Sequence, residues 1–277
     1  MQLLTNAEVL DGYDAVTELY SYIPSLSLWR GWEKAAYSKF ELSGRILDLG
    51  CGDGRYFRLL WPACNQVVGV EISPEVARLG NQSGVYENIH IASAHAIPEL
   101  DQSFDHVFAN CSLEHMDNLD KVLSEVFRCL KPGGTLLCSV VTNYFIEWSV
   151  LPAMIAQTGH ESAAKNLQKQ SLDVHHLANP LTIEGWNNHF SMNGFQVMQY
   201  IPLLPKFTTG LFLLIDSIWH INKEDGGELG DLIFPFLAMN DKFPLGFRKV
   251  LEGVLEMEMD HSNGSGAVFL IRKPFNG

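Results

Sequence analysis

Basic charge and paired cysteines are what this 277-residue sequence has least of. Lys and Arg number 19 against 32 Asp and Glu, which gives a formal net charge of −13. This balance disfavours nucleic acid and anionic lipid as partners, because both are held by cationic side chains. No Cys-x-x-Cys pair occurs among the five cysteines, which are Cys51, Cys64, Cys111, Cys129 and Cys138. This usage favours free thiols in a reducing cytoplasm over a disulfide framework or a zinc site.

The sequence also has no long apolar run and no pattern typical of a leader. The longest apolar segment, Gly210 to Ile221, contains Asp216 and is shorter than the roughly 20 residues that a membrane-spanning helix needs. No basic stretch followed by an apolar one stands at the N-terminus, as it would in a secretory signal. We therefore expect a cytoplasmic location and no stable membrane insertion. The hydrophobic content of 47% indicates a globular chain with a substantial core.

What the sequence does have is an alternation of short apolar runs with helix-like stretches. Runs typical of buried strands occupy residues 45–49, 66–71, 88–92, 104–110 and 135–141. Between them, Ser73 and Pro74 form a helix start. A second helix carries an apolar stripe and is expected to stop at the Lys-Pro-Gly-Gly segment, 131–134. The alternation predicts a parallel sheet with helices on both faces and ligands at the carboxyl ends of the strands.

A glycine-rich loop follows the first predicted strand. Gly50, Gly52 and Gly54 permit a tight turn whose amide groups approach a ligand. Glu71, ending the second strand, can accept hydrogen bonds from both hydroxyls of a ribose. A dinucleotide fold needs Gly-x-Gly-x-x-Gly, but position 55 is Arg. The acid Asp48 suits an ammonium group rather than phosphates, which favours S-adenosylmethionine and leaves a nicotinamide oxidoreductase as an alternative.

Four segments carry a family resemblance, namely LDLGCGDG, VGVEIS, AIPELDQSFDHVFANCSLEHM and VFRCLKPGGTLL. In order and spacing they resemble the motifs of class I S-adenosylmethionine-dependent methyltransferases, particularly the group acting on small molecules. The resemblance covers about Gly44 to Val141. It implies an α/β, Rossmann-like, doubly wound sheet of seven strands, six parallel and the last antiparallel. N-terminal helices and a helical insertion would elaborate this sheet.

The resemblance also implies contacts to the methionine part of the cofactor. Asp48 would lie near its amino group, and Gly50, Cys51 and Gly52 would supply the loop backbone. Asn110 and Cys111 would border the same part. On the helices expected near the N-terminus, Tyr13 is a candidate to lean on the cofactor and Arg30 to hold its carboxylate. Packing over the sheet is the competing interpretation for both of these side chains.

Contacts to the adenosine part follow from the same resemblance. Glu71 would bind the ribose, Ile72 would pack against the adenine, and Ala94 and His95 would meet the adenine edge. The family usually has an acid just after the third strand, where this sequence offers Ser93 or His95. Adenine recognition is therefore expected to differ from the family pattern.

The chemistry of methyl transfer is direct displacement, which needs a base only if the acceptor must lose a proton. Histidine is the usual base near neutral pH. His115 follows the fourth strand, and His175 and His176 precede a turn in what we expect to be a loop. These three are the candidate catalytic residues, with structural roles as the alternative. A metal site is not expected, because only Asp173 accompanies the histidine pair.

The expected organisation places the methyl acceptor outside the common fold. We predict an N-terminal helical cap (1–44), a cofactor-binding core (45–202) with a lid or substrate segment (142–182), an apolar helical insertion (203–265) and a final strand (266–277). The insertion is a candidate lid with aromatic walls, namely Phe207, Phe212, Trp219, Phe234, Phe236 and Phe243. An accessory layer, a homodimer surface and a membrane contact are the alternatives, and four acids disfavour the last. They are Glu224, Asp225, Glu228 and Asp231.

The main hypothesis is a small-molecule methyltransferase acting on an apolar or aromatic acceptor, with oxygen favoured and nitrogen and carbon open. A lipid or quinone acceptor at a membrane surface and a non-catalytic cofactor-binding protein are the alternatives. Nucleic-acid amino methyltransferases carry Asn or Asp followed by Pro-Pro and an aromatic residue after the fourth strand. This sequence has ANCSLEH there, so no nucleic-acid substrate is expected.

Overall fold

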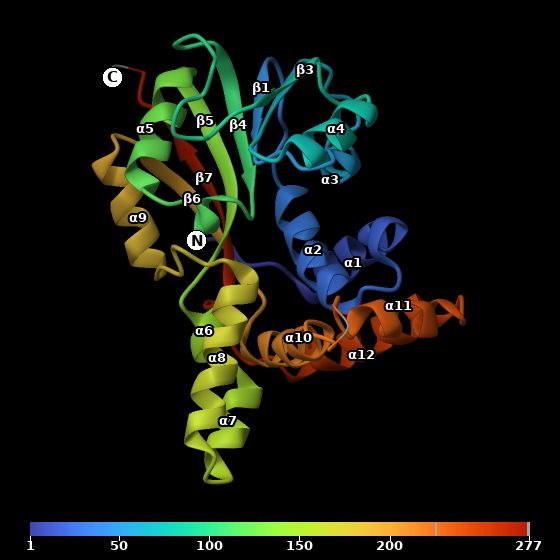
Figure 1. Cartoon of the computed structure of the whole chain (residues 1–277). Helices are drawn as coiled ribbons and strands as arrows, with labels where there is room; N and C mark the ends of the chain where they lie inside the picture. Colours follow the sequence, from blue (N-terminus) through green and yellow to red (C-terminus); the bar gives the residue numbers. More distant parts are fainter. Residues whose placement is uncertain (225, 276–277) are drawn as a thin grey trace.

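The computed structural model describes residues 1–224 and 226–275. A seven-stranded sheet with the order β3-β2-β1-β4-β5-β7-β6 forms the centre of the molecule (Figure 1). The strands are β1 (Ile46–Leu49), β2 (Val67–Glu71), β3 (Asn88–Ile91), β4 (Phe104–Asn110), β5 (Leu130–Val141), β6 (Gln196–Leu203) and β7 (Gly266–Arg272). Only β7 runs antiparallel to its neighbours β5 and β6, so the expected fold class is confirmed.

The fifth strand begins earlier than its apolar run indicates. Helix α5 (Leu119–Cys129) ends before Leu130, and β5 runs from Leu130 through the Lys-Pro-Gly-Gly segment. Leu130 pairs with Phe104 and Thr135 with His106, with a register irregularity between the pairs. Gly133, at a φ of 80°, occurs in this stretch. The segment expected to stop the helix is therefore an irregular part of the strand.

Helices cover both faces of the sheet. Side chains of α5 and α9 (Ile183–Met192) share one core cluster with β1, β2, β4, β5 and β7. The other large cluster contains side chains of α1 (Asn6–Tyr20), α2 (Pro24–Tyr37) and α3 (Arg55–Leu60). Helix α4 (Pro74–Gln82) starts as predicted, with the backbone N–H of Val76 donating to the Ser73 side chain. The core thus lies on both sides of the parallel strands.

The two N-terminal helices cross at close range. A Cβ added to Gly12 would lie 2.2 Å from the carbonyl oxygen of Gly31. Tyr13 beside it is buried, and its hydroxyl donates to the carbonyl oxygen of Pro244 at 3.1 Å. The structure therefore places Tyr13 in helix packing, against the insertion, and not at the end of the strands.

Two further groups of helices lie at the carboxyl end of the sheet. After β5 come α6 (Tyr144–Glu147), α7 (Val150–Gln157) and α8 (Glu161–His175), of which α7 and α8 extend beyond the sheet (Figure 1). Between β6 and β7 come α10 (Lys206–Trp219), α11 (Gly230–Ala238) and α12 (Phe243–Met257). Asp225, one of the insertion's acids, lies outside the described residues. Among the described helices, none is both long and apolar enough to cross a membrane.

Candidate active site

The glycine loop after β1 has a backbone that side chains would disturb. Gly50, Gly52 and Gly54 have φ angles of 73°, 57° and 75°, in the left-handed region that glycine enters at little cost. A Cβ on Gly50 would lie 2.9 Å from Cβ of Ser112, whereas a Cβ on Gly52 would meet nothing within 4 Å. The close approach of the Gly50 backbone to the end of β4 therefore depends on the missing side chain.

The carboxylate of Glu71 fixes this loop from the end of β2. Its Oε2 accepts from the backbone N–H of Gly52 at 3.2 Å, and its Oε1 accepts from the N–H of Ser73 at 2.9 Å. Glu71 also lines the adjoining cavity. Its remaining lone pairs are the acceptors that the two hydroxyls of a ribose require.

A cavity of about 410 Å³ lies at the carboxyl ends of β1, β2 and β4. We call it the cofactor cavity. Six predicted cofactor residues line it, namely Gly50, Glu71, Ile72, Ala94, His95 and Cys111. Neither Lys nor Arg is among its lining residues, so it suits a cationic ligand without phosphates. The side chain of Ile72 is 72% exposed and is available to cover a flat apolar ring.

Asp48 lies under the loop, outside the lining of this cavity. The carboxyl group is 3% exposed and accepts from the hydroxyl of Tyr86 at 2.7 Å. Burial raises the pKa of Asp48 to about 7, against the opposing effect of the Tyr86 hydrogen bond. A positive charge bound near the loop would favour its ionised form.

His95 bridges two loops at the far end of the cofactor cavity. Its Nε2 donates to the carbonyl oxygen of Asp117 at 2.6 Å, so its Nδ1 accepts from the Ser93 hydroxyl at 3.0 Å. Asp117 also lines this cavity. The sequence analysis did not single out Asp117. This residue places an acid at the end of the cofactor cavity where the family pattern expects one.

Asn110 and Cys111, at the end of β4, have different surroundings, and only Cys111 lines the cofactor cavity. The Asn110 amide oxygen accepts from the Tyr37 hydroxyl at 2.9 Å, which holds Asn110 against α2 and outside the cavity lining. Cys111 has a φ of 43°, and its thiol donates to Oε1 of Glu33 at 2.9 Å. Burial raises the pKa of the Cys111 thiol well above its ordinary value, so this side chain stays protonated.

Glu33 lies at the centre of a buried network beside the candidate site, and the sequence analysis did not single it out. Its buried carboxylate accepts from Cys111, from Trp29 Nε1 at 3.0 Å, from Arg30 Nη1 at 2.6 Å and from the Ser139 hydroxyl. Burial alone would lower the pKa of Arg30, but the Glu33 charge keeps it well above its ordinary value. Nε of Arg30 has no hydrogen-bond partner among the described residues. This network holds Arg30 at a second cavity and not in the lining of the cofactor cavity.

The second cavity, of about 380 Å³, lies between α2, the ends of β4 and β5, α6, the end of α8 and α10. We call it the acceptor cavity. Apolar side chains dominate its lining, among them Trp29, Phe145, Phe212 and Trp219. Only Phe212 and Trp219 of the six aromatic residues expected as walls line it, while Phe207, Phe234 and Phe236 are exposed. Cys111 and His115 line both cavities, so the two spaces adjoin there.

His115 is held in one tautomer at this junction. Its Nδ1 lies 3.3 Å from the carbonyl oxygen of His176, so Nδ1 carries the proton and Nε2 has a free lone pair. Burial lowers the pKa of His115 below its ordinary value. The side chain of His176 lines neither cavity, and the residue caps α8 at a φ of 47°. Its carbonyl group, and not its ring, reaches the site.

His175 ends α8, so the histidine pair does not lie in a loop as expected. Nε2 of His175 lies 2.8 Å from Oδ2 of Asp216 on α10. Burial alone would raise the pKa of Asp216, but hydrogen bonds from His175 and His220 lower it below its ordinary value. All three side chains line the acceptor cavity. The expectation that only Asp173 accompanies the pair was wrong, because the partners come from the insertion.

Glu114 precedes His115 in the segment after the fourth strand and lies at the same junction. It is 0% exposed and lines the acceptor cavity between Cys111 and His115. Neither carboxyl oxygen has a hydrogen-bond partner among the described residues. Burial raises its pKa to about 8. A buried polar group without a partner is costly, so Glu114 is available to a polar atom of a bound molecule.

Comparisons with known proteins place these features in a family. Residues 47–138 match a family model described as a methyltransferase domain. The sterol 4-C-methyltransferase of Caenorhabditis elegans is 36% identical over 107 residues, covering 36% of this chain and 32% of that protein. A ubiquinone/menaquinone biosynthesis C-methyltransferase of Pasteurella multocida is 27% identical over 186 residues, covering 59% and 67%. The alignment with the sterol enzyme thus spans only about a third of its length.

Solved structures share the fold over nearly the whole chain. A structure of an S-adenosylmethionine-dependent methyltransferase of Thermotoga maritima has a TM-score of 0.55 and 18% identity, covering 95% of this chain and 94% of that one. At this identity the likeness concerns the fold alone. Together with the matched domain and the cofactor cavity, it leads to one assignment. Residues 47–138 match a methyltransferase domain within the methyltransferase fold, and together these findings support a class I S-adenosylmethionine-dependent methyltransferase with S-adenosylmethionine as its cofactor.

Proposed function

We propose that this protein transfers a methyl group from S-adenosylmethionine to a small, moderately apolar acceptor, with oxygen as the favoured methylated atom. The observation that carries this proposal is the junction of the cofactor and acceptor cavities at Cys111 and His115. Bound in the cofactor cavity, S-adenosylmethionine supplies an activated methyl group. Aromatic walls around the acceptor cavity exclude water and orient the acceptor.

His115 is the proposed base for an acceptor hydroxyl. Its Nε2 lone pair is free because Nδ1 donates to His176, and the side chain lines both cavities. The proton lost by the acceptor would reside on Nε2. Since burial lowers the pKa of His115 from 6.5, the base is already neutral at pH 7.

The pH dependence of turnover tests this role. We expect kcat/KM to rise with pH to a plateau, with its midpoint below pH 6.5 because His115 must be neutral. His115→Gln is expected to lower kcat by roughly 100-fold or more and to remove this limb. In the assay, the purified protein is given S-adenosylmethionine and a cell extract as the source of the acceptor. The release of S-adenosylhomocysteine is then measured. A limb near pH 8 retained in His115→Gln would instead assign the base to Glu114, whose pKa is about 8.

Cofactor binding is expected to depend on the protonation of Asp48. A cationic ligand favours the carboxylate form, and the pKa of Asp48 is about 7. Affinity for S-adenosylmethionine should therefore rise between pH 6 and pH 7.5, by about fivefold to tenfold if only the carboxylate form binds. Isothermal titration measures this change. Asp48→Asn should bind weakly at both pH values, and an unchanged pH dependence in this variant would contradict the assignment.

A second candidate is methylation of a quinone-like or sterol-like acceptor at carbon. Both relatives described above are named as C-methyltransferases, and exposed apolar side chains on α11 offer a surface for a lipophilic carrier. They include Leu232, Phe234 and Phe236. With a ¹³C-labelled methyl donor, the carbon chemical shift of the product distinguishes an O-methyl from a C-methyl group. If the protein binds S-adenosylmethionine but forms no labelled product, the alternative of a cofactor-binding protein without methyl transfer is favoured.

A further inference from the structure

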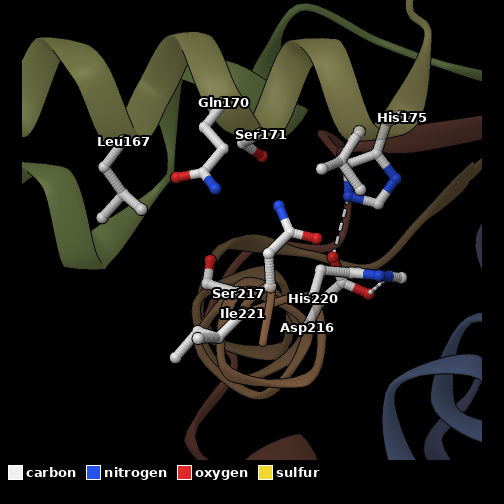
Figure 2. A pocket seen from close by; sticks show the side chains of 10 residues that line it. Leu167, Gln170, Ser171, His175, Asp216, Ser217, His220 and Ile221 are labelled. Atoms are coloured by element: carbon white, nitrogen blue, oxygen red, sulfur yellow. Dashed lines mark hydrogen bonds and ion pairs between the residues drawn. The ribbon is translucent and has the colours of Figure 1, made fainter. Parts of the chain in front are cut away.

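Three side chains with metal-binding atoms converge beside the acceptor cavity. His175 ends α8, Asp216 lies on α10, and His220 follows four positions later as the C-cap of that helix. Nε2 of His175 lies 2.8 Å from Oδ2 of Asp216, and Nε2 of His220 lies 3.6 Å from Oδ1. Figure 2 shows both rings directed at the carboxylate, one from the end of α8 and one from the residue that follows α10.

The spacing of these atoms suits a single ion. One ligand atom from each residue lies within 4.8 Å of the other two. Donor atoms around a tetrahedral zinc ion are roughly 3.3 Å apart, given bonds of about 2.0 Å. Small side-chain rotations would therefore bring all three atoms to an ion. Two imidazoles and one carboxylate favour zinc and similar transition metals over magnesium or calcium.

A second carboxylate supports this arrangement from outside. Oε2 of Glu228 lies 2.9 Å from Nδ1 of His220. A carboxylate on the outer nitrogen of a metal-binding histidine fixes the tautomer and directs the other nitrogen at the ion. Asp216 is only 7% exposed, and it stands in a helix whose other residues are mostly apolar. A carboxylate buried in this way is kept where it is paired or binds a metal, and Asp216 faces two imidazole rings.

Space for further ligands lies on two sides of the three side chains. All three line the acceptor cavity and also a smaller cavity of about 170 Å³ between α8 and α10. Figure 2 shows the polar side chains Gln170, Ser171 and Ser217 around this smaller cavity. Three protein ligands with open positions are typical of metal sites that bind water or substrate.

We propose that His175, Asp216 and His220 bind one divalent transition-metal ion of the zinc type, with an open coordination position facing the acceptor cavity. That position would take an oxygen of the acceptor, such as a carbonyl, hydroxyl or carboxylate oxygen. The acceptor class rests on the proposed function, whereas the metal site does not. The sequence-based expectation of no metal is replaced by this proposal.

Metal titration in the absence of cofactor and acceptor tests the site. The full chain is stripped with a chelator, dialysed and titrated with Zn²⁺ by calorimetry and with Co²⁺ by visible absorption. We expect one ion per chain with a dissociation constant in the micromolar range or below, and ligand-field bands for Co²⁺. Asp216→Asn and His220→Gln should each weaken binding by roughly 100-fold, and Glu228→Gln by roughly tenfold or more.

The matched control is His160→Ala, which removes an exposed histidine that contacts Thr158 at the turn before α8. This variant should bind the metal as the parent does. Absence of stoichiometric binding to the parent would overturn the proposal and leave the three residues as a hydrogen-bonded network. Equal binding by the parent and by folded His220→Gln would also overturn it. If the variants do not fold, crystals of the parent soaked with Zn²⁺ decide, since anomalous density elsewhere contradicts the site.

Failure of this proposal is separable from failure of the proposed function. A chain that binds Zn²⁺ at these residues but does not bind S-adenosylmethionine would retain the metal site and lose the methyltransferase proposal. A chain that releases S-adenosylhomocysteine equally with and without the chelator would retain methyl transfer and lose the metal's contact with the acceptor.

Discussion

Replacement of Gly50 by alanine is expected to weaken S-adenosylmethionine binding by at least roughly 100-fold. Two costs combine at this position. A φ of 73° in a residue with a Cβ is strained, by about 1 to 2 kcal/mol. The added Cβ would also lie 2.9 Å from Cβ of Ser112, so either the loop or the end of β4 must move. Both segments line the cofactor cavity, and isothermal titration measures the loss.

The neighbouring glycine separates these two costs. Gly52 has a φ of 57° but no heavy atom within 4 Å of an added Cβ. Gly52→Ala should therefore show the strain without the collision and lose less affinity than Gly50→Ala. Gly246→Ala, inside α12 and likewise without neighbours, should leave binding unchanged and stabilise the helix by about 0.5 to 1 kcal/mol. Equal affinities of Gly50→Ala and the parent would contradict the role of the loop.

Replacement of Glu114 by methionine should raise stability and lower turnover together. The side chains have similar volumes, and the carboxyl of Glu114 has no hydrogen-bond partner among the described residues. Its removal takes away a buried polar group that costs free energy in the folded protein. A bound acceptor loses the polar contact at the junction of the cavities, so we expect turnover to fall by roughly 100-fold.

The gain in stability should grow with pH. Glu114 has a pKa of about 8 in the folded protein, against 4.5 as the model value for an unfolded chain. Because the unfolded chain loses this proton first, the parent loses stability as pH rises from about 4.5 to about 8. The loss is on the order of 5 kcal/mol at most. Glu114→Met lacks it, so urea unfolding at pH 8.5 should show a larger gain than at pH 5.5.

Glu161→Met supplies the control for this substitution, because Glu161 is exposed at the start of α8. It should change neither turnover nor the pH dependence of unfolding. A Glu114→Met variant that is less stable than the parent at pH 8.5 would show that the carboxyl group has a stabilising partner in solution. Full turnover in that variant would remove Glu114 from the active site.

Local sequence signals predicted the sheet and the cofactor end of the site. The apolar runs before Leu49, Glu71 and Asn110 became β1, β2 and β4, because buried parallel strands need continuous apolar segments. The glycine loop and Glu71 lie next to these strands in the sequence, so their positions followed. The predicted start of β5 was wrong, because Pro132 and Gly133 are typical of a turn. In the structure they lie within an irregular part of the strand.

The acceptor end could not be predicted in this way, because its residues come from distant segments. Asp216 meets His175 across 41 positions, and Cys111 meets Glu33 across 78. Neither Glu33 nor Asp216 belongs to a recognisable sequence motif. Each lies in a segment whose pattern predicts only a helix packed against the core. Their role follows only from three-dimensional contacts. The same holds for Arg30, whose partner Glu33 directs it to the acceptor cavity.

The antiparallel last strand has a consequence for synthesis of the chain. Strand β6 pairs with β7 alone, and β5 receives β7 on its second edge. A growing polypeptide therefore holds β6 without a partner until the three helices of the insertion and then Gly266–Arg272 have left the ribosome. During that interval two bare strand edges are open to other chains. Helix α10, which lines the acceptor cavity, is thus synthesised before the sheet is complete. Chaperone protection therefore matters most in the final stage of translation.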